Sequence, residues 1–319
     1  MYMVKIMKLS LIIPCYNEAS NIAPFFQKVT STFSGHISNF ELIFVNDGSK
    51  DDTLKNLKEI LSSTNVDMKI INFSRNFGKE AAMFAGIKES SGDYVSLIDA
   101  DLQQDPEYIV KMVEFLDENK DYDCVAAYQD ERHESAIKIF FKNCFYKLIN
   151  RLAEVDFKNG ASDFRTFRRP VADAIISMGE YHRFSKGIFP WVGFETYYMP
   201  YDTNARLSGT SSWSLIKLFK YAFEGIVAFT TTPLKISSWI GGLSSITALI
   251  YMIVVIVQKL AFSIAIPGYA TIVVLILFFN GLQLMTLGII GEYLSKTYIQ
   301  TKKRPIYITK EILENKKPR

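Results

Sequence analysis

The stretch that decides the fold reads YVSLIDADLQQDP and runs from Tyr94 to Pro106. An apolar run ends abruptly at two aspartates, Asp99 and Asp101, which are separated by one alanine. A short apolar run bounded by polar residues is typical of a buried strand. Two carboxylates this close repel each other unless a cation lies beside them. The stretch therefore predicts a buried strand that carries negative charge to the edge of a sheet.

Similar apolar runs occur along the first half of the chain. We expect strands at residues 9–14, 40–46, 68–73, 94–99 and 122–128. Segments with helical spacing lie between them, such as DDTLKNLKEIL, in which Leu54, Leu57 and Leu61 share one face. This alternation predicts an α/β fold with a Rossmann-like, mostly parallel sheet and helices on both of its faces.

Polar side chains follow four of the predicted strands. They are Asn17 and Glu18, then Asp47, then Arg75 and Asn76, and finally Asp99 and Asp101. Ligands bind beyond the carboxyl ends of the strands in sheets of this kind. The strand ends are therefore the candidate functional site.

The acidic pair suggests a metal site. Together with the amide oxygen of Gln103, the carboxylates of Asp99 and Asp101 form an all-oxygen set suited to Mg²⁺ or Mn²⁺. The alternative for this stretch alone is a solvated acidic loop with a helix-capping aspartate.

Composition changes sharply after Ile236. The whole chain is 49% hydrophobic and 22% charged, yet residues 236–258 and 260–291 carry no charge at all. About 20 apolar residues cross a bilayer core, so each run predicts a transmembrane helix and the two together a hairpin. Basic residues flank the hairpin on both sides, so we expect a multi-pass cell-membrane protein whose α/β domain and both termini lie in the cytoplasm.

These patterns divide the chain into four parts. We expect a catalytic domain at 1–212, a juxtamembrane amphipathic helix at 213–235, two transmembrane helices at 236–294 and a basic cytoplasmic tail at 295–319. Five glycines in the spans could allow close packing with a second copy, so a homo-oligomer is possible: Gly241, Gly242, Gly281, Gly288 and Gly291.

Several classes of protein are disfavoured. A formal charge of +3, without a basic stripe in the first half, argues against a nucleic-acid partner. The cysteines Cys15, Cys124 and Cys144 lack metal-ligand spacing and an even number, which favours a reducing compartment. No glycine-rich fingerprint follows the first strand, which disfavours a dehydrogenase.

The ordered motifs resemble the family-2 glycosyltransferases of the GT-A fold. Within that family the chain is similar to the polyprenyl-phosphate sugar transferases, which include dolichol-phosphate mannose synthase and bacterial undecaprenyl-phosphate glucosyltransferases. The matching stretches are LSLIIPCYNE, LIFVNDGSKDDT, FSRNFGKEAA, DADLQQDPE, GASDFRTFRR, FPWVGF and RLSGTSSWS. Where the family usually has DLQDPP, this chain has DLQQDP, which keeps Gln103.

The resemblance implies a role for each matching residue. The positions that match a site for uracil and ribose are Pro14, Tyr16, Asn17, Glu18 and Asp47. The metal and diphosphate site matches Asp99, Asp101 and Gln103, with Lys79 as a further donor-phosphate candidate. The positions near the diphosphate or the acceptor phosphate are Arg132, Arg206 and Ser211. The reaction centre matches Asp163 and Arg165, which we expect to be catalytic together with Asp101.

Each of these residues also has a structural alternative. Tyr16 could pack in the core, and Asp47 could cap the turn DGS. Asp163 and Arg165 could form a structural ion pair, and Lys79 could merely coat the start of a helix.

The activity implied by the resemblance is metal-dependent, inverting hexosyl transfer. The expected donor is a UDP-hexose, with glucose first, and the expected acceptor is a membrane polyprenyl phosphate such as undecaprenyl phosphate, for modification of cell-envelope glycans. The alternatives are transfer of N-acetylglucosamine, or of mannose from GDP-mannose, to the same lipid class, and a non-catalytic membrane-anchored scaffold that binds nucleotide sugars. A processive polysaccharide synthase is disfavoured because the chain has no Gln-x-x-Arg-Trp motif.

Overall fold

The computed structural model describes residues 7–129, 147, 149–151, 155–158, 160–202, 227, 229–262 and 268–315. The predicted site residues Arg132, Arg206 and Ser211 lie outside these ranges, as do residues 213–226 of the expected juxtamembrane helix. The chain divides into two compact units. The first comprises Met1–Phe219 with Arg304–Arg319, and the second comprises Lys220–Lys303.

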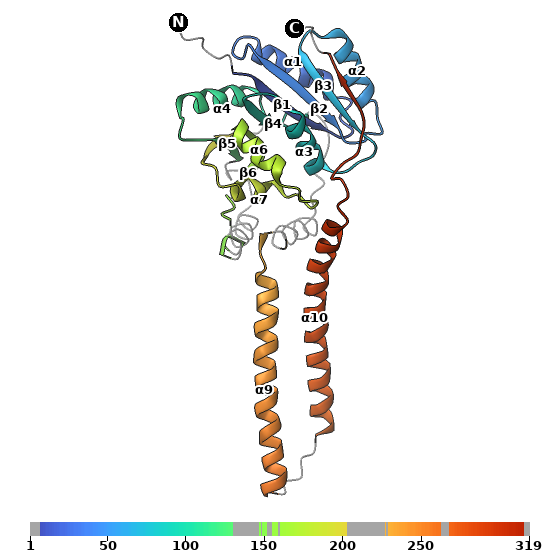
Figure 1. Cartoon of the computed structure of the whole chain (residues 1–319), viewed down its shortest axis with the longest axis vertical. Helices are drawn as coiled ribbons and strands as arrows, with labels where there is room; N and C mark the ends of the chain where they lie inside the picture. The colour runs from blue at the N-terminus through green and yellow to red at the C-terminus, as the bar shows by residue number, and fades with distance from the viewer. Residues whose placement is uncertain are drawn as a thin grey trace. The chain divides into compact units, whose positions relative to one another are not determined.

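Within the described residues, the first unit is built on an eight-stranded sheet with the order β7-β5-β6-β4-β1-β2-β3-β8. Figure 1 labels β1 to β6 of this sheet. The parallel strands at its centre are β1 (Leu9–Cys15), β2 (Phe40–Asn46), β3 (Asp67–Phe73) and β4 (Tyr94–Leu97). The flanking strands are β5 (Cys124–Gln129), β6 (Ala161–Arg168), β7 (Thr196–Tyr201) and β8 (Thr309–Glu314). Strand β6 is antiparallel to β4 and β5, and β8 is antiparallel to β3. The expected mostly parallel α/β sheet is confirmed.

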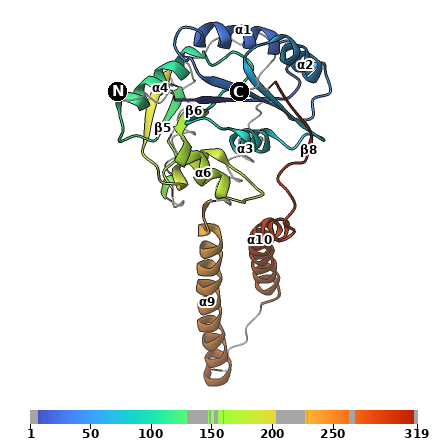
Figure 2. The same ribbon diagram turned by 45° about the horizontal axis from the view of Figure 1, so that its top comes forward.

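Helices cover both faces of this sheet (Figure 2). One face carries α1 (Ile22–Phe33), α2 (Thr53–Ser63) and α4 (Glu107–Glu118), whose apolar residues join Leu11 and Ile13 in one core cluster. The other face carries α3 (Lys79–Glu89), α6 (Arg169–Ser177) and α7 (Ser185–Trp191). Gly86 of α3 lies so close to Ile12 that a Cβ atom there would clash with the isoleucine side chain. The helix thus packs directly on β1 beneath the candidate site.

Strand β8 differs from the sequence expectation. Residues 295–319 were expected to form a tail, whereas Thr309–Glu314 is an edge strand and α10 (Tyr269–Thr301) extends beyond residue 294. The strand alternates half-buried and exposed residues and is rich in charge, as edge strands often are. That charge hides the strand pattern in the sequence.

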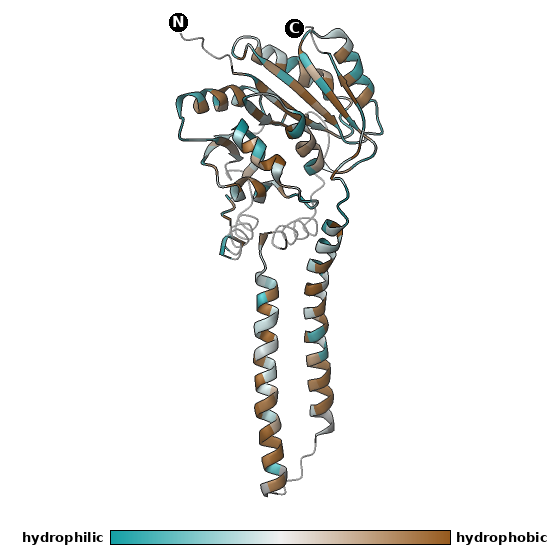
Figure 3. Ribbon diagram, in the orientation of Figure 1, coloured by the Kyte–Doolittle hydropathy of each residue, from teal (hydrophilic) through white to brown (hydrophobic). Residues whose placement is uncertain are grey.

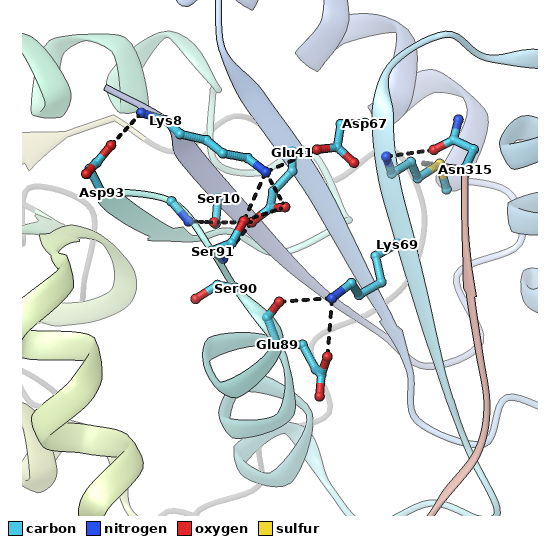
Figure 4. Close-up of polar contacts among 12 residues, drawn as sticks. Lys8, Ser10, Glu41, Asp67, Lys69, Glu89, Ser90, Ser91, Asp93 and Asn315 are labelled. Atoms are coloured by element: carbon cyan, nitrogen blue, oxygen red, sulfur yellow. Dashed lines mark hydrogen bonds and ion pairs between the residues drawn. The ribbon is translucent and has the colours of Figure 1, made fainter. Parts of the chain in front are cut away.

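Side chains fasten β8 to the sheet. Asn315 accepts a hydrogen bond from the backbone N–H of Met68 at 2.9 Å (Figure 4). It also donates to the carbonyls of Thr64 and Val66. At the other end of the strand, the ring of Tyr307 stacks on Phe73 with 4.9 Å between centroids. The C-terminal segment is therefore anchored at both of its ends.

A buried carboxylate joins the amino-terminal ends of the central strands. Glu41 of β2 accepts hydrogen bonds from Lys8, Ser10 and Ser91 (Figure 4). Burial alone would raise the pKa of Glu41, but these hydrogen bonds outweigh burial and lower it. The charge of Glu41 therefore ties the loop before β4 to β1 and β2.

The second unit contains α9 (Thr232–Phe262) and α10. Most of their large apolar side chains are exposed, and both helices are largely hydrophobic (Figure 3). Among the described residues, Thr232–Gln258 and Thr271–Thr301 are long and apolar enough to cross a membrane, with mean hydropathies of 2.3 and 2.2. The Tyr293 hydroxyl donates to the Thr230 carbonyl at 2.6 Å, so the start of the first helix lies beside the end of the second. This arrangement could form a transmembrane hairpin.

Candidate active site

Lys79 bridges two acidic residues that are far apart in the sequence. Its Nζ atom lies 2.7 Å from Asp99 Oδ1 and 3.4 Å from Asp163 Oδ2. Lys79 begins α3, Asp99 follows β4, and Asp163 lies on β6. Strand β6 pairs with β4 so that Arg165 faces Leu97, and continuing this register by two residues brings Asp163 beside Asp99. The structure thus brings together Lys79 and Asp99, which were predicted to bind the donor, and Asp163, which was predicted to be catalytic.

The charges in this group support one another. Burial would lower the pKa of Lys79, but the carboxylates of Asp99 and Asp163 outweigh burial and raise it. Burial would raise the pKa of Asp163, but Lys79, Lys186 and Arg165 outweigh it and lower that pKa. Both Lys79 and Asp163 are therefore charged at neutral pH.

Two buried polar atoms on β6 lack hydrogen-bond partners within the part of the chain that the structure describes. Asp163 Oδ1 and Arg165 Nε are buried without a hydrogen-bond partner among the described residues. Arg165 is only 4% exposed, and its guanidinium lies 3.8 Å from the centre of the Phe189 ring. The contact of Asp163 Oδ2 with Lys79 replaces the alternative of a simple Asp163–Arg165 ion pair. Leaving a buried polar group unpaired costs about 1–3 kcal/mol. A ligand that bonded to Asp163 Oδ1 or Arg165 Nε would recover part of this cost.

A small cavity adjoins Arg165. It is lined by Arg165 together with Lys158 and Lys186, and by the ring of Tyr198. Lys186 was not predicted from the sequence, because a single lysine at the start of a short helix carries no distinctive signal. The cavity places positive charge on the same side of β6 as Asp163.

The loop that carries the two aspartates adopts an uncommon backbone conformation. Leu102 has φ +59°, in the left-handed region, and its side chain packs against the core. Such a conformation costs a non-glycine residue of the order of 1 kcal/mol. The amide oxygen of the buried Gln104 accepts the Asp99 N–H at 3.0 Å, and Asp101 Oδ1 accepts the Gln103 N–H at 3.2 Å. Gln104, which sequence reasoning missed, therefore shapes the loop.

The residues present fit a divalent cation that also binds substrate. Within the described ranges, no group of three or more His, Cys, Asp or Glu side chains could hold a metal ion by itself. Mg²⁺ is commonly held by one or two carboxylates together with water and substrate phosphates. The pKa of Glu18 is raised by burial and, despite a hydrogen bond from Asn21, by Asp101 and Asp99. A cation bound by Asp99 and Asp101 would reduce the repulsion between their carboxylates and Glu18.

Asp47 shapes the loop that leads to Lys79. Its two carboxylate oxygens accept the backbone N–H groups of Phe77 at 2.6 Å and Gly78 at 2.9 Å. The carboxylate of Asp47 thus binds the loop after β3 instead of capping its own DGS turn. Gly48 has φ +65°, and a Cβ atom there would clash with the backbone of Arg75. The turn after β2 is thus pressed against the loop after β3.

The turn after β1 is joined to the turn after β2. Asn17 has φ +56°, donates its N–H to Ser49 Oγ at 3.0 Å and accepts the Lys50 N–H at 2.9 Å. Tyr16 is 43% exposed, which excludes the alternative of core packing. Pro14 is half-buried within β1. An exposed aromatic ring and a pair of linked turns lie along one side of the predicted site.

Comparison with known proteins places these features in a family. The family described as Glycosyl transferase family 2 matches residues 10–176. The Uncharacterized glycosyltransferase sll0501 of Synechocystis sp. is 40% identical over 306 residues, which are 96% of this chain and 95% of that protein. The Prophage bactoprenol glucosyl transferase homolog of Escherichia coli K12 is 36% identical over 306 residues, which are 96% of this chain and 99% of that protein. A solved structure of glucosyl-3-phosphoglycerate synthase from Mycobacterium tuberculosis, with Mn²⁺, UDP and phosphoglyceric acid, has a TM-score of 0.46 and 17% identity, covering 69% of this chain and 76% of that one.

Proposed function

This chain belongs to glycosyl transferase family 2, and from that membership we propose that it transfers glucose from UDP-glucose to a membrane polyprenyl phosphate such as undecaprenyl phosphate. The bactoprenol glucosyl transferase homolog is similar along almost its whole length, which supports both the sugar and the acceptor class. The product would be a glucosyl phospholipid for modification of cell-envelope glycans.

The contact of Lys79 with Asp99 and Asp163 carries this proposal. It joins the acidic loop, which would hold the donor diphosphate, to the carboxylate expected at the reaction centre. A structural role alone would leave no reason for unpaired atoms on Asp163 and Arg165 at the same place. The arrangement supports a site where a donor and an acceptor meet.

Little base catalysis is needed at such a site. A phosphate monoester has its second pKa near ~6, so the acceptor is already largely ionised at neutral pH. The buried Arg165, with Lys158 and Lys186 around the adjoining cavity, would bind the acceptor phosphate and offset its repulsion from the donor. Asp163 would orient the acceptor or stabilise positive charge that develops on the sugar.

Charge on the departing nucleotide must also be balanced. Asp101 and Asp99, with the amide oxygen of Gln103, would hold Mg²⁺ or Mn²⁺, which neutralises the leaving diphosphate. Lys79 would keep Asp99 in place beside it. Attack by the acceptor from the face opposite the diphosphate would invert the configuration at the anomeric carbon. Tyr16 and the linked turns around Asn17 and Asp47 would hold the nucleotide.

The apolar helices fit a lipid substrate. Each CH₂ of a polyprenyl tail costs about 0.8 kcal/mol to expose to water, so the catalytic unit must work at the membrane surface. The chain leaves the first unit, forms α9 and α10, and returns to pair β8 with β3. This connection requires an even number of membrane crossings. Together with the flanking basic residues it supports a multi-pass protein whose catalytic unit lies in the cytoplasm.

The test is a product assay with the purified full-length protein. It would be incubated with undecaprenyl phosphate, Mn²⁺ and, separately, UDP-glucose, UDP-N-acetylglucosamine and GDP-mannose, followed by mass analysis of the lipid. We expect a hexose added only from UDP-glucose, and NMR of the isolated product should show the opposite anomeric configuration to the donor. Transfer from another donor would overturn the sugar assignment, and release of no nucleotide from any donor would favour a binding scaffold.

Two matched variants test the site itself. Asp101→Asn should abolish transfer without changing thermal stability. Asp105→Asn, in the same loop, should retain transfer because Asp105 pairs with Lys28 on α1. Equal activities of the two variants would remove the assignment of Asp101.

A further inference from the structure

We propose that Glu311 of the C-terminal strand β8 is a positioning residue for the nucleotide sugar, because it orients a row of buried amides that ends at the turn after β2. This inference rests on the proposed function, which assigns that turn to the donor. Glu311 itself would not touch the substrate.

The row crosses three neighbouring strands. Asn46 at the end of β2 lies opposite Asn72 of β3, and Asn72 lies opposite Glu311 of β8. Asn46 Nδ2 donates to Asn72 Oδ1 at 2.8 Å, and Asn72 Nδ2 donates to Glu311 Oε1 at 3.1 Å. At the other end of the row, Asn46 Oδ1 accepts the Ser49 N–H at 3.4 Å. Asn46 and Asn72 are 1% and 4% exposed, so water has little access to either amide.

The carboxylate fixes the direction of the row. An asparagine side chain can present either its oxygen or its NH₂ group to a neighbour, whereas an ionised carboxylate can only accept. Asn72 must therefore turn its NH₂ group toward Glu311 and its oxygen toward Asn46. Asn46 in turn must give its NH₂ group to Asn72, which leaves its oxygen facing the N–H of Ser49.

A lysine partner further favours the charged form of Glu311. Lys58 of α2 donates to Glu311 Oε1 at 2.8 Å, and this hydrogen bond is the main cause of a lowered pKa at Glu311. Lys58 contacts neither asparagine in the row, so the ion pair and the amide row can be separated by mutation.

The end of the row lies next to the predicted nucleotide residues. Ser49 Oγ accepts the N–H of Asn17, and Asn17 accepts the N–H of Lys50. The Asp47 N–H donates to the carbonyl of Cys15 at 2.9 Å. A reversed amide at Asn46 would place two donors face to face at Ser49 and loosen these contacts. The orientation set at Glu311 therefore reaches both turns of the donor side.

The test compares three variants of the full-length protein by KM for UDP-glucose and by kcat. Glu311→Leu removes the acceptor and should raise the KM about tenfold, the equivalent of one buried hydrogen bond, with a much smaller change in kcat. Glu311→Gln keeps an acceptor oxygen and should restore a KM within about threefold of the wild type. Lys58→Met removes only the ion pair and should behave like the wild type.

A fourth variant separates positioning from simple anchoring. Asn315→Ala weakens the attachment of β8 to β3 without altering the row, so it should lower thermal stability and leave the KM unchanged. If Asn315→Ala raises the KM as much as Glu311→Leu does, attachment of the strand rather than amide orientation is responsible and the proposal is overturned. A wild-type KM in Glu311→Leu would overturn it as well.

Hydrogen–deuterium exchange gives a readout that does not need activity. Glu311→Leu should speed exchange in the peptide that contains Asn46 to Lys50, whereas Glu311→Gln should not. If the wild type transfers no sugar, the proposed function fails while this measurement still decides whether the row acts on the turn. Unchanged exchange in Glu311→Leu would show that it does not.

Discussion

Replacement of Lys79 by methionine should reduce turnover about 10- to 30-fold. The substitution keeps the length of the side chain but removes the charge that contacts Asp99 and Asp163. Those contacts place the two carboxylates within roughly 6 Å of each other, where two unit charges repel by roughly 3 kcal/mol at an effective dielectric constant of 20. Lys79 and Asp99 are each more than a third exposed, so solvent screening reduces this to about 1.4–2 kcal/mol.

Repulsion of that size would displace Asp163 or favour its protonation. Either change would remove a charge from the proposed reaction centre, and 1.4–2 kcal/mol corresponds to about 10- to 30-fold in rate. Lys79→Arg, which keeps the charge, should remain within about fivefold of the wild type. The assay is the steady-state rate of UDP release with undecaprenyl phosphate and UDP-glucose.

A double-mutant cycle decides whether the bridge itself matters. If Lys79 acts through Asp163, the loss in Lys79→Met should be much smaller in an Asp163→Asn background, with a coupling energy of at least about 1 kcal/mol. If the fold-loss of the double variant equals the product of the two single-variant losses, the two residues act independently and this reasoning is refuted. Full turnover in Lys79→Met would refute it directly.

Other positions give simpler expectations. Gly48→Ala should lower the melting temperature and abolish UDP binding, because Gly48 has a positive φ and the new Cβ atom would clash with the Arg75 backbone. Gly35→Ala is the control, since its Cβ atom would enter open space and should change neither property. Calorimetry measures both the melting temperature and UDP binding. Tyr16→Ala should raise the KM for UDP-glucose several-fold with no change in melting temperature, because the ring is exposed; an unchanged KM would remove Tyr16 from the donor site. The pKa of Glu41 in the folded protein is lowered from its ordinary value of 4.5, so the ionised carboxylate stabilises the fold at pH values above 4.5. This stabilisation is lost as the pH falls through the lowered pKa. Glu41→Gln should therefore be less stable than the wild type by about 1–3 kcal/mol at pH 7, and denaturation curves should show this difference shrinking below about pH 4. A difference that stays constant with pH would show that the charge of Glu41 does not stabilise the fold.

The sequence predicted the central strands well because their side chains are buried on both faces. Strands β1 to β4 read as short runs of Leu, Ile and Val, and the polar residues that follow them mark one edge of the sheet. Strands β6 and β8 carry charge inside the strand, in ASDFRTFR and TKEILE, so their patterns resemble surface segments. Arg165 is a buried charge in the middle of β6, which no hydrophobic pattern reveals.

The candidate site was predicted in its residue types but not in its contacts. Lys79, Asp99 and Asp163 are brought together by the antiparallel pairing of β6 with β4, and the charges within β6 hide that strand from a hydrophobic pattern. The role of Gln104 depends on the left-handed backbone at Leu102, which leucine rarely adopts and which propensity cannot foresee. Such contacts are set by the tertiary fold.

The position of β8 in the chain imposes an order on biosynthesis. The strand is translated only after both apolar helices, so a nascent chain that has made β1 to β7 still exposes the open edge of β3. An unpaired edge is a template for aggregation until a partner strand covers it. Completion of the sheet is therefore delayed until both apolar helices have been synthesised.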